Sequence, residues 1–250
     1  MKVYDTLLIG CSYALVGYAL NSKNTLIVEQ TQSADTRFYL PLRSYNLDAY
    51  TPTTEYGKSL LDTFNSFKLI DGEKINANAL ESAFCDFLCR SDLEITFKSR
   101  VIDVAQENDL YIAKIITNGG IITVKTKKII DTTVSAPLST TLTVMVKGEL
   151  TKDEEIKITN AFGGATIQNT FYKDVYAVFL QNPNCLDYNA MLNDFYNKWK
   201  TVGAKVKTLY VAPTFSKIAK KEKGFPKDEY FGNPIEAFEE GYYYAQKGEN

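Results

Sequence analysis

The first thirty residues alternate between apolar runs and short polar breaks. Residues 3–9 (VYDTLLI) form a strand-like run that ends at Gly10, a short apolar helix follows, and residues 25–28 (TLIV) form a second apolar run that ends at the acid Glu29. Apolar runs of this length, bounded by turn residues, are typical of buried parallel strands. The order strand, tight turn, helix, strand and acid predicts a βαβ unit at the start of the chain.

Further periodicities predict the elements up to residue 135. They are a short helix at 55–67 within a loop-like stretch (30–72), an amphipathic helix at 75–91, strands at 93–97 and 100–104, a hairpin of 110–117 and 121–125 around Asn118-Gly119-Gly120, and a strand at 128–133. This order predicts an α/β fold with parallel strands.

Residues 136–207 change in character and predict a smaller α+β lobe. Strand patterns at 142–146, 165–172 and 175–180 come with a helix near 188–200. Residues 208–211 are expected to return to the first sheet, and a helix that follows Pro234 is expected to close the fold. We therefore expect one domain made of residues 1–135 and 208–250, with 136–207 as a substrate or cap lobe.

Composition and charge exclude several classes of protein. The chain has 250 residues, 45% of them hydrophobic, and a formal charge of −2 with scattered basic residues, so no nucleic-acid partner is indicated. No apolar stretch reaches the roughly 18 residues of a membrane span, and the chain starts with a strand instead of a leader sequence. We expect a cytoplasmic protein without membrane association.

The absence of histidine restricts the chemistry. It excludes a Ser-His-Asp or Cys-His nucleophile and a histidine-ligated metal within this chain. The four cysteines show no C-x-x-C spacing, so we expect buried reduced thiols and no metal site. A redox cofactor would supply the reactive centre and leave binding and orientation to the protein.

The opening βαβ unit offers a dinucleotide site. Gly10 suits the tight turn, the amides at the start of the following helix suit a pyrophosphate, and Glu29 suits ribose hydroxyls. Two departures from the G-x-G-x-x-G fingerprint are Ser12 and Leu15. The alternative is that this βαβ unit belongs to an α/β protein that binds no nucleotide.

The whole chain resembles the FAD-dependent oxidoreductases with two dinucleotide-binding domains. Residues 5–14 resemble the opening of that family, 79–104 its helix and the strands beside the adenosine site, and 110–133 its meander and the strand that ends in Ala-Thr-Gly, here Asp131-Thr132-Thr133. Residues 233–245 resemble its closing helix. The resemblance covers a little under half of the chain.

The resemblance implies a Rossmann-like FAD-binding domain with a central parallel sheet and a β-meander. It also implies an FAD-dependent oxidoreductase that transfers a hydride between a small-molecule substrate and the flavin. Adenine would lie near Val101, and the flavin would face the second lobe. The implied cofactor-binding residues are Gly10, Ser12, Tyr13, Ala14, Glu29, Gln30, Arg43, Val101, Thr132, Thr133, Asn233, Pro234 and Ile235. The resemblance implies no particular catalytic residue.

Two substitutions favour an alternative function. Leu15 replaces the family's third glycine, and Thr133 replaces the glycine of Ala-Thr-Gly. A non-catalytic or partner-dependent subunit with a weakened or lost FAD site would tolerate both, with a second copy or a partner subunit sharing the cofactor. An NAD-binding dehydrogenase is a third, weaker reading.

Overall fold

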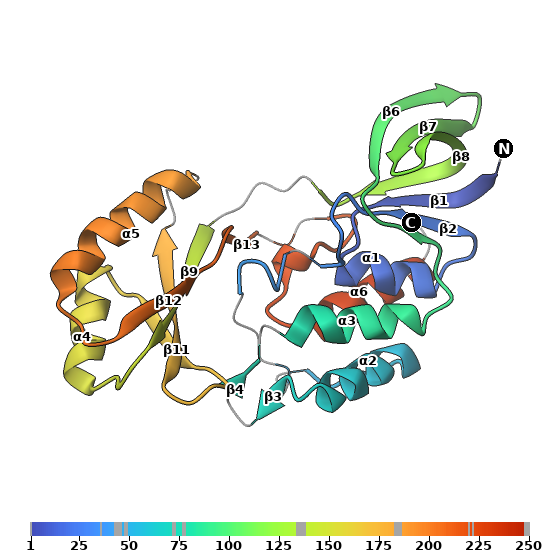
Figure 1. The fold of residues 1–250 in the computed structure, drawn as a ribbon. Coiled ribbons are helices and arrows are strands. Elements are labelled where there is room, and N and C mark those ends of the chain that lie inside the picture. Colours follow the sequence, from blue (N-terminus) through green and yellow to red (C-terminus); the bar gives the residue numbers. More distant parts are fainter. Residues whose placement is uncertain are drawn as a thin grey trace.

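The computed structural model describes residues 2–35, 37–42, 47, 50–71, 74–76, 79–133, 139–182, 187–219, 221 and 223–247. Its larger sheet has the strand order β5-β2-β1-β8-β7-β6 (Figure 1). These strands are β1 (Val3–Ile9), β2 (Thr25–Val28), β5 (Ile95–Thr96), β6 (Arg100–Glu107), β7 (Leu110–Thr117) and β8 (Gly120–Asp131). The predicted α/β fold, with parallel strands and a β-meander, is confirmed.

Strand β8 joins the meander to the parallel strands. Residues 120–126 pair antiparallel with β7, and residues 125–131 pair parallel with β1. The prediction of two separate strands at 121–125 and 128–133 is wrong, because one continuous strand changes its pairing partner. The carboxyl ends of β1, β2 and β8 consequently lie at one edge of the sheet, where ligands of α/β proteins bind.

Four helices pack together beside the parallel strands (Figure 1). They are α1 (Tyr13–Leu20), α2 (Glu55–Ser66), α3 (Leu80–Cys89) and α6 (Pro234–Lys247). Helix α2 confirms the helix predicted at 55–67. Helix α3 begins later than predicted, because Ile75 lies in β4 (Lys74–Ile75), which pairs with β3 (Ile70–Asp71). The core beneath these helices is rich in aromatic rings, among them Tyr13, Phe38, Phe64, Phe84 and Phe238.

Helices α1 and α6 approach each other closely through their backbones. A Cβ added at Gly17 would lie 1.9 Å from the carbonyl oxygen of Phe238, and one added at Gly241 would lie 1.9 Å from that of Ala14. Such distances are far below a van der Waals contact, so only glycine fits at either position. Gly17 thus brings α1 close to α6, a neighbouring helix.

The second sheet is antiparallel and lies beside the first sheet and its helices (Figure 1). Its strands are β9 (Ser139–Lys147), β10 (Thr166–Asn169), β11 (Val175–Asn182), β12 (Lys207–Val211) and β13 (Ser216–Ile218). Helices α4 (Lys152–Ala161) and α5 (Tyr188–Val202) pack against it, and this lobe has its own apolar core around Val144, Val178 and Phe195. Among the described residues, no helix has the length and apolar character needed to cross a bilayer.

The predicted return of residues 208–211 to the first sheet is wrong. Strand β12 pairs antiparallel with β9, with Thr208 opposite Val146, and β13 also pairs with β9. Val206 and Phe215, which flank β12, join the core of the second lobe, so burial of these side chains keeps the strand there. The second sheet therefore extends to Ile218, whereas the division into domains stays a prediction.

Candidate functional site

The turn after β1 depends on Gly10. Its φ is +100°, a backbone conformation that residues with a side chain rarely adopt, and its amide donates to the Val28 carbonyl at 2.9 Å. Leu15 is fully buried, and its Cδ1 atom would lie 3.7 Å from a Cβ added at Gly10. Leu15, which replaces the third glycine of the fingerprint, therefore packs next to Gly10.

A cavity of about 420 Å³ opens beside this turn, and we call it the Gly10 cavity. It lies at the carboxyl ends of the parallel strands and is walled on one side by β6. Its lining is Ile9, Gly10, Val28, Glu29, Gln30, Ser99, Arg100, Val101, Ile102, Asp103, Val104, Asp131 and Thr133. Five predicted cofactor-binding residues, Gly10, Glu29, Gln30, Val101 and Thr133, thus come together around one cavity.

The Glu29 carboxylate stabilises the turn by hydrogen bonds. One carboxylate oxygen accepts the Cys11 amide at 2.7 Å, and the other accepts the amide and the hydroxyl of Thr31 at 2.7 and 2.8 Å. The side chain is only 7% exposed. Its predicted role as the ribose acceptor stays a prediction, and a ribose would share a carboxylate that already has these donors.

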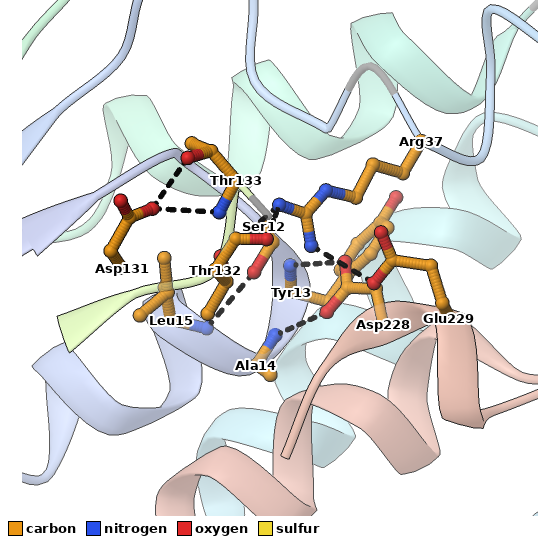
Figure 2. Close-up of polar contacts among 10 residues, drawn as sticks. All are labelled: Ser12, Tyr13, Ala14, Leu15, Arg37, Asp131, Thr132, Thr133, Asp228 and Glu229. Carbon is orange, nitrogen blue, oxygen red and sulfur yellow. Dashed lines mark hydrogen bonds and ion pairs between the residues drawn. The ribbon is translucent and has the colours of Figure 1, made fainter. Parts of the chain in front are cut away.

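The amides at the N-terminus of α1 bind a carboxylate of the protein itself. Asp228, in the 3₁₀ helix η3 (Asp228–Tyr230), accepts the Tyr13 amide at 2.9 Å and the Ala14 amide at 3.0 Å (Figure 2). Ser12 caps the helix, and its hydroxyl accepts the Leu15 amide at 3.3 Å. The predicted residues Ser12, Tyr13 and Ala14 therefore present their helix terminus to Asp228.

Sequence reasoning gave Asp228 no role. It lies 215 residues from Tyr13 along the chain, beyond the reach of any local pattern. The available clue was an Asp-Glu pair shortly before the closing helix, and such pairs are common on surfaces. Asp228 is instead fully buried.

Arg37 connects η3 to the end of β8. Its guanidinium pairs with Glu229 at 3.1 Å and donates to the carbonyl and the hydroxyl of Thr132, the latter at 3.2 Å (Figure 2). The Asp131 carboxylate accepts the amide and the hydroxyl of Thr133 at 2.8 and 2.5 Å. The predicted residues Thr132 and Thr133 are therefore held by contacts within the protein.

Two buried carboxyl groups near this helix terminus have raised pKa values. Burial raises the pKa of Asp228, and the Arg37 guanidinium and the α1 amides offset it only in part. Burial and the neighbouring Asp228 raise the pKa of Asp35 well above its usual range, despite opposing contributions from Tyr13 and Arg37. Asp228 thus disfavours the ionised form of Asp35.

The cysteines differ in exposure. Cys11 is a free, buried thiol whose pKa is raised well above its usual range by burial and by Glu29, so it is unreactive. Cys85 is half-buried and Cys89 is exposed. The expected burial is therefore wrong for Cys89, at the end of α3, and Cys185 lies outside the described residues.

The remaining predicted residues do not line the Gly10 cavity. Asn233 caps α6, since its side-chain oxygen accepts the Ile235 amide at 2.8 Å, and its amide group donates to the Leu47 carbonyl at 3.3 Å. Pro234 and Ile235 are buried. Arg43 lies outside the described residues. The roles of these residues stay predictions.

A larger cavity of about 790 Å³ lies between the loop after β2 and the second sheet, and we call it the sheet-face cavity. Most of its wall is apolar or aromatic, and its charged groups are Lys147, Lys173 and Glu81. The other lining residues are Tyr39, Leu40, Leu42, Met145, Tyr172, Val175, Leu209 and Tyr210. The Leu42 carbonyl accepts the Thr143 hydroxyl at 3.4 Å, which joins the loop to β9.

No protein-family model matches the chain, and no curated protein matches it in sequence. Solved structures do match. A geranylgeranyl bacteriochlorophyll reductase-like protein from Thermoplasma acidophilum has a TM-score of 0.59 at 13% identity, over 98% of this chain and 78% of that one. Aklavinone-11 hydroxylase, solved with FAD and aklavinone, has a TM-score of 0.56 at 12% identity, over 98% and 62%.

p-Nitrophenol 4-monooxygenase from Pseudomonas putida also matches, with a TM-score of 0.54 at 12% identity over 86% of this chain and 68% of that one. The chain shares the fold of these proteins. The predicted Rossmann-like architecture and the resemblance in fold are therefore confirmed. The chain spans 52% of the length of another match, the anhydrotetracycline hydroxylase from Streptomyces rimosus.

Proposed function

We propose that the protein is a flavoprotein oxidoreductase that takes up FAD with the adenosine half in the Gly10 cavity. The observation that carries the proposal is the gathering of Gly10, Glu29, Gln30, Val101 and Thr133 around one cavity of about 420 Å³. The cavity lies at the carboxyl ends of parallel strands, where nucleotides bind in α/β folds. Its volume lies within the usual range for ligand sites.

The residues fit the two halves of such a ligand unequally. Apolar Val101 and the acceptors of Glu29 and Gln30 suit adenine and ribose. The pyrophosphate does not fit the described conformation, because the Tyr13 and Ala14 amides already bind Asp228. FAD, when bound, would supply the redox chemistry, and a chain without histidine would bind and orient it.

The proposed substrate is a small apolar or aromatic anion in the sheet-face cavity. Aromatic walls favour a flat apolar body, and Lys147 and Lys173 against the single carboxylate of Glu81 favour a negative group. Hydride transfer between this substrate and the flavin is part of the proposal. A cytoplasmic location also remains a proposal.

A second candidate function is that of a non-catalytic subunit whose FAD site is weakened. Asp228 favours it, because a buried carboxylate competes with phosphate for the same helix amides. In this reading a second copy of the chain or a partner subunit completes the cofactor site.

Uptake of FAD by the purified protein distinguishes the two functions. We expect saturable binding, measured by quenching of flavin fluorescence, and its loss in Val101→Trp, whose indole would fill the cavity. Ile121→Trp, at a hairpin position that is 62% exposed, is the matched control and should bind as the wild type does. Binding that survives in a folded Val101→Trp variant would place the cofactor elsewhere, and no uptake by any variant would favour the second function.

A further inference from the structure

The Asp228 carboxylate lies where a helix N-terminus binds an anion. Each of its two oxygens accepts one amide of the first turn of α1, at 2.9 and 3.0 Å, and the side chain has no exposed surface. Free amides and the helix dipole favour a negative group at this position. A carboxylate with this two-point geometry makes the contacts that a phosphate group would make.

The segment that carries Asp228 is held at several points. The Glu229 carboxylate pairs with Arg37, and the Glu229 carbonyl accepts the Ala219 amide at 3.2 Å. Arg37 is bound in turn to Thr132 at the end of β8. All of these contacts are polar, and a phosphate would compete for the same Arg37 and the same amides.

A second observation indicates that this arrangement is not optimal. Asp35 is 2% exposed, and the Tyr13 side chain, Arg37 and the Phe38 backbone offset only part of the rise in its pKa that burial and Asp228 cause. Asp35 and Asp228 therefore place two buried acids close to one another, with Arg37 as their shared cation. Withdrawal of Asp228 from α1 would separate the two acids and make ionisation of Asp35 less unfavourable.

We propose that Asp228 is an internal gate of the cofactor site: it occupies the pyrophosphate position, and a dinucleotide binds only when η3 withdraws Asp228 from the α1 amides. This inference rests on the proposed function, because it describes how the FAD site is regulated. The ligand fragment that the gate controls is the diphosphate, and the adenosine cavity is independent of it.

The gate should depend on pH. Among the described residues, the charged and titratable groups that interact with Asp228 are Arg37 and Asp35 on the loop after β2, Glu229 on η3, and Cys11 at the glycine turn. Protonation of Asp228 weakens its hold on the amides and lowers the negative charge that a diphosphate must meet. Affinity for a diphosphate should therefore fall as the pH rises through the raised pKa of Asp228.

Calorimetric titration with three ligands tests the gate. Adenosine probes the cavity alone, ADP adds the diphosphate, and FAD is the full cofactor. Asp228→Asn should bind ADP and FAD at least about tenfold more tightly than the wild type, because charge-assisted hydrogen bonds are replaced by weaker ones. Its affinity for adenosine should stay within about twofold. Glu240→Gln, the same charge change on the exposed side of α6, should leave all three affinities unchanged.

The outcomes separate the two proposals. If adenosine binds but Asp228→Asn and the wild type bind ADP equally, the gate is wrong and the adenosine cavity stands. If no variant binds adenosine, ADP or FAD between pH 5 and 8, the proposed function is wrong and the gate with it. Should Asp228→Asn not fold, the wild type decides, because an affinity for ADP that does not fall with rising pH overturns the gate.

Discussion

Replacing Gly241 with alanine tests the contact that holds α1 against α6. The added Cβ would lie 1.9 Å from the Ala14 carbonyl oxygen, about 1 Å inside the 3.0 Å that real Cβ contacts keep. The clash is with backbone, so no side-chain rotation relieves it, and the two helices must separate. The amides of α1 would shift with the helix, which couples this contact to the cofactor site.

The expected loss of stability follows from two opposing effects. Alanine gains about 1 kcal/mol over glycine in a helix interior. Overpacking costs up to about 3 kcal/mol, and a backbone clash belongs at the upper end of that range. The net change is a loss of about 2 kcal/mol, which corresponds to a fall in Tm of roughly 4–8 °C for a chain of this size.

Thermal unfolding followed by circular dichroism measures this change. Gly232→Ala is the matched control, because a Cβ at that position would meet nothing within 4 Å, and its Tm should stay within about 2 °C of the wild type. A Gly241→Ala variant as stable as the wild type would show that the two helices do not cross at this distance.

Three further predictions follow from single contacts. Hydrogen bonds from the loop before α2 outweigh burial and lower the pKa of Glu239, so Glu239→Gln should cost about 2–3 kcal/mol in urea unfolding at pH 7. The stabilisation by Glu239 is complete above the usual carboxyl pKa of about 4.3 and is lost as the pH falls through the lowered folded pKa. The difference in unfolding free energy between the wild type and Glu239→Gln should therefore disappear in acid, and a difference independent of pH would contradict this. The double variant Lys147→Glu and Lys173→Glu should weaken binding of an aromatic sulfonate dye by about tenfold or more, and unchanged binding would remove these lysines from the site. Cys89 should react with a thiol reagent in the native protein and Cys11 only after unfolding, and fast labelling of Cys11 would refute its burial.

Local patterns were sufficient to predict the opening βαβ unit. The strand 3–9, the turn at Gly10 and the acid Glu29 are contiguous, and each is decided by neighbours in the sequence. The gathering of Gln30 and Thr133 around Gly10 follows from the order of parallel strands, since their carboxyl ends share one edge. Val101 reaches the same cavity from the start of β6, an antiparallel strand of the meander.

Contacts between distant segments could not be predicted in this way. The pairing of β12 with β9 depends on which core buries Val206 and Phe215, and strand periodicity alone does not decide that. Asp228 reaches the amides of α1 only because η3 lies beside that helix in the folded chain. Motif analysis therefore could not identify Asp228, the residue that most changes the interpretation of the site.

Titration of the wild-type protein with FAD is the most direct test of the central claim. The account predicts saturable uptake, with quenching of flavin fluorescence, that becomes stronger as the pH is lowered and is lost in Val101→Trp but kept in Ile121→Trp. Absence of FAD uptake by both the wild type and Asp228→Asn, at every pH where the proteins stay folded, would contradict it.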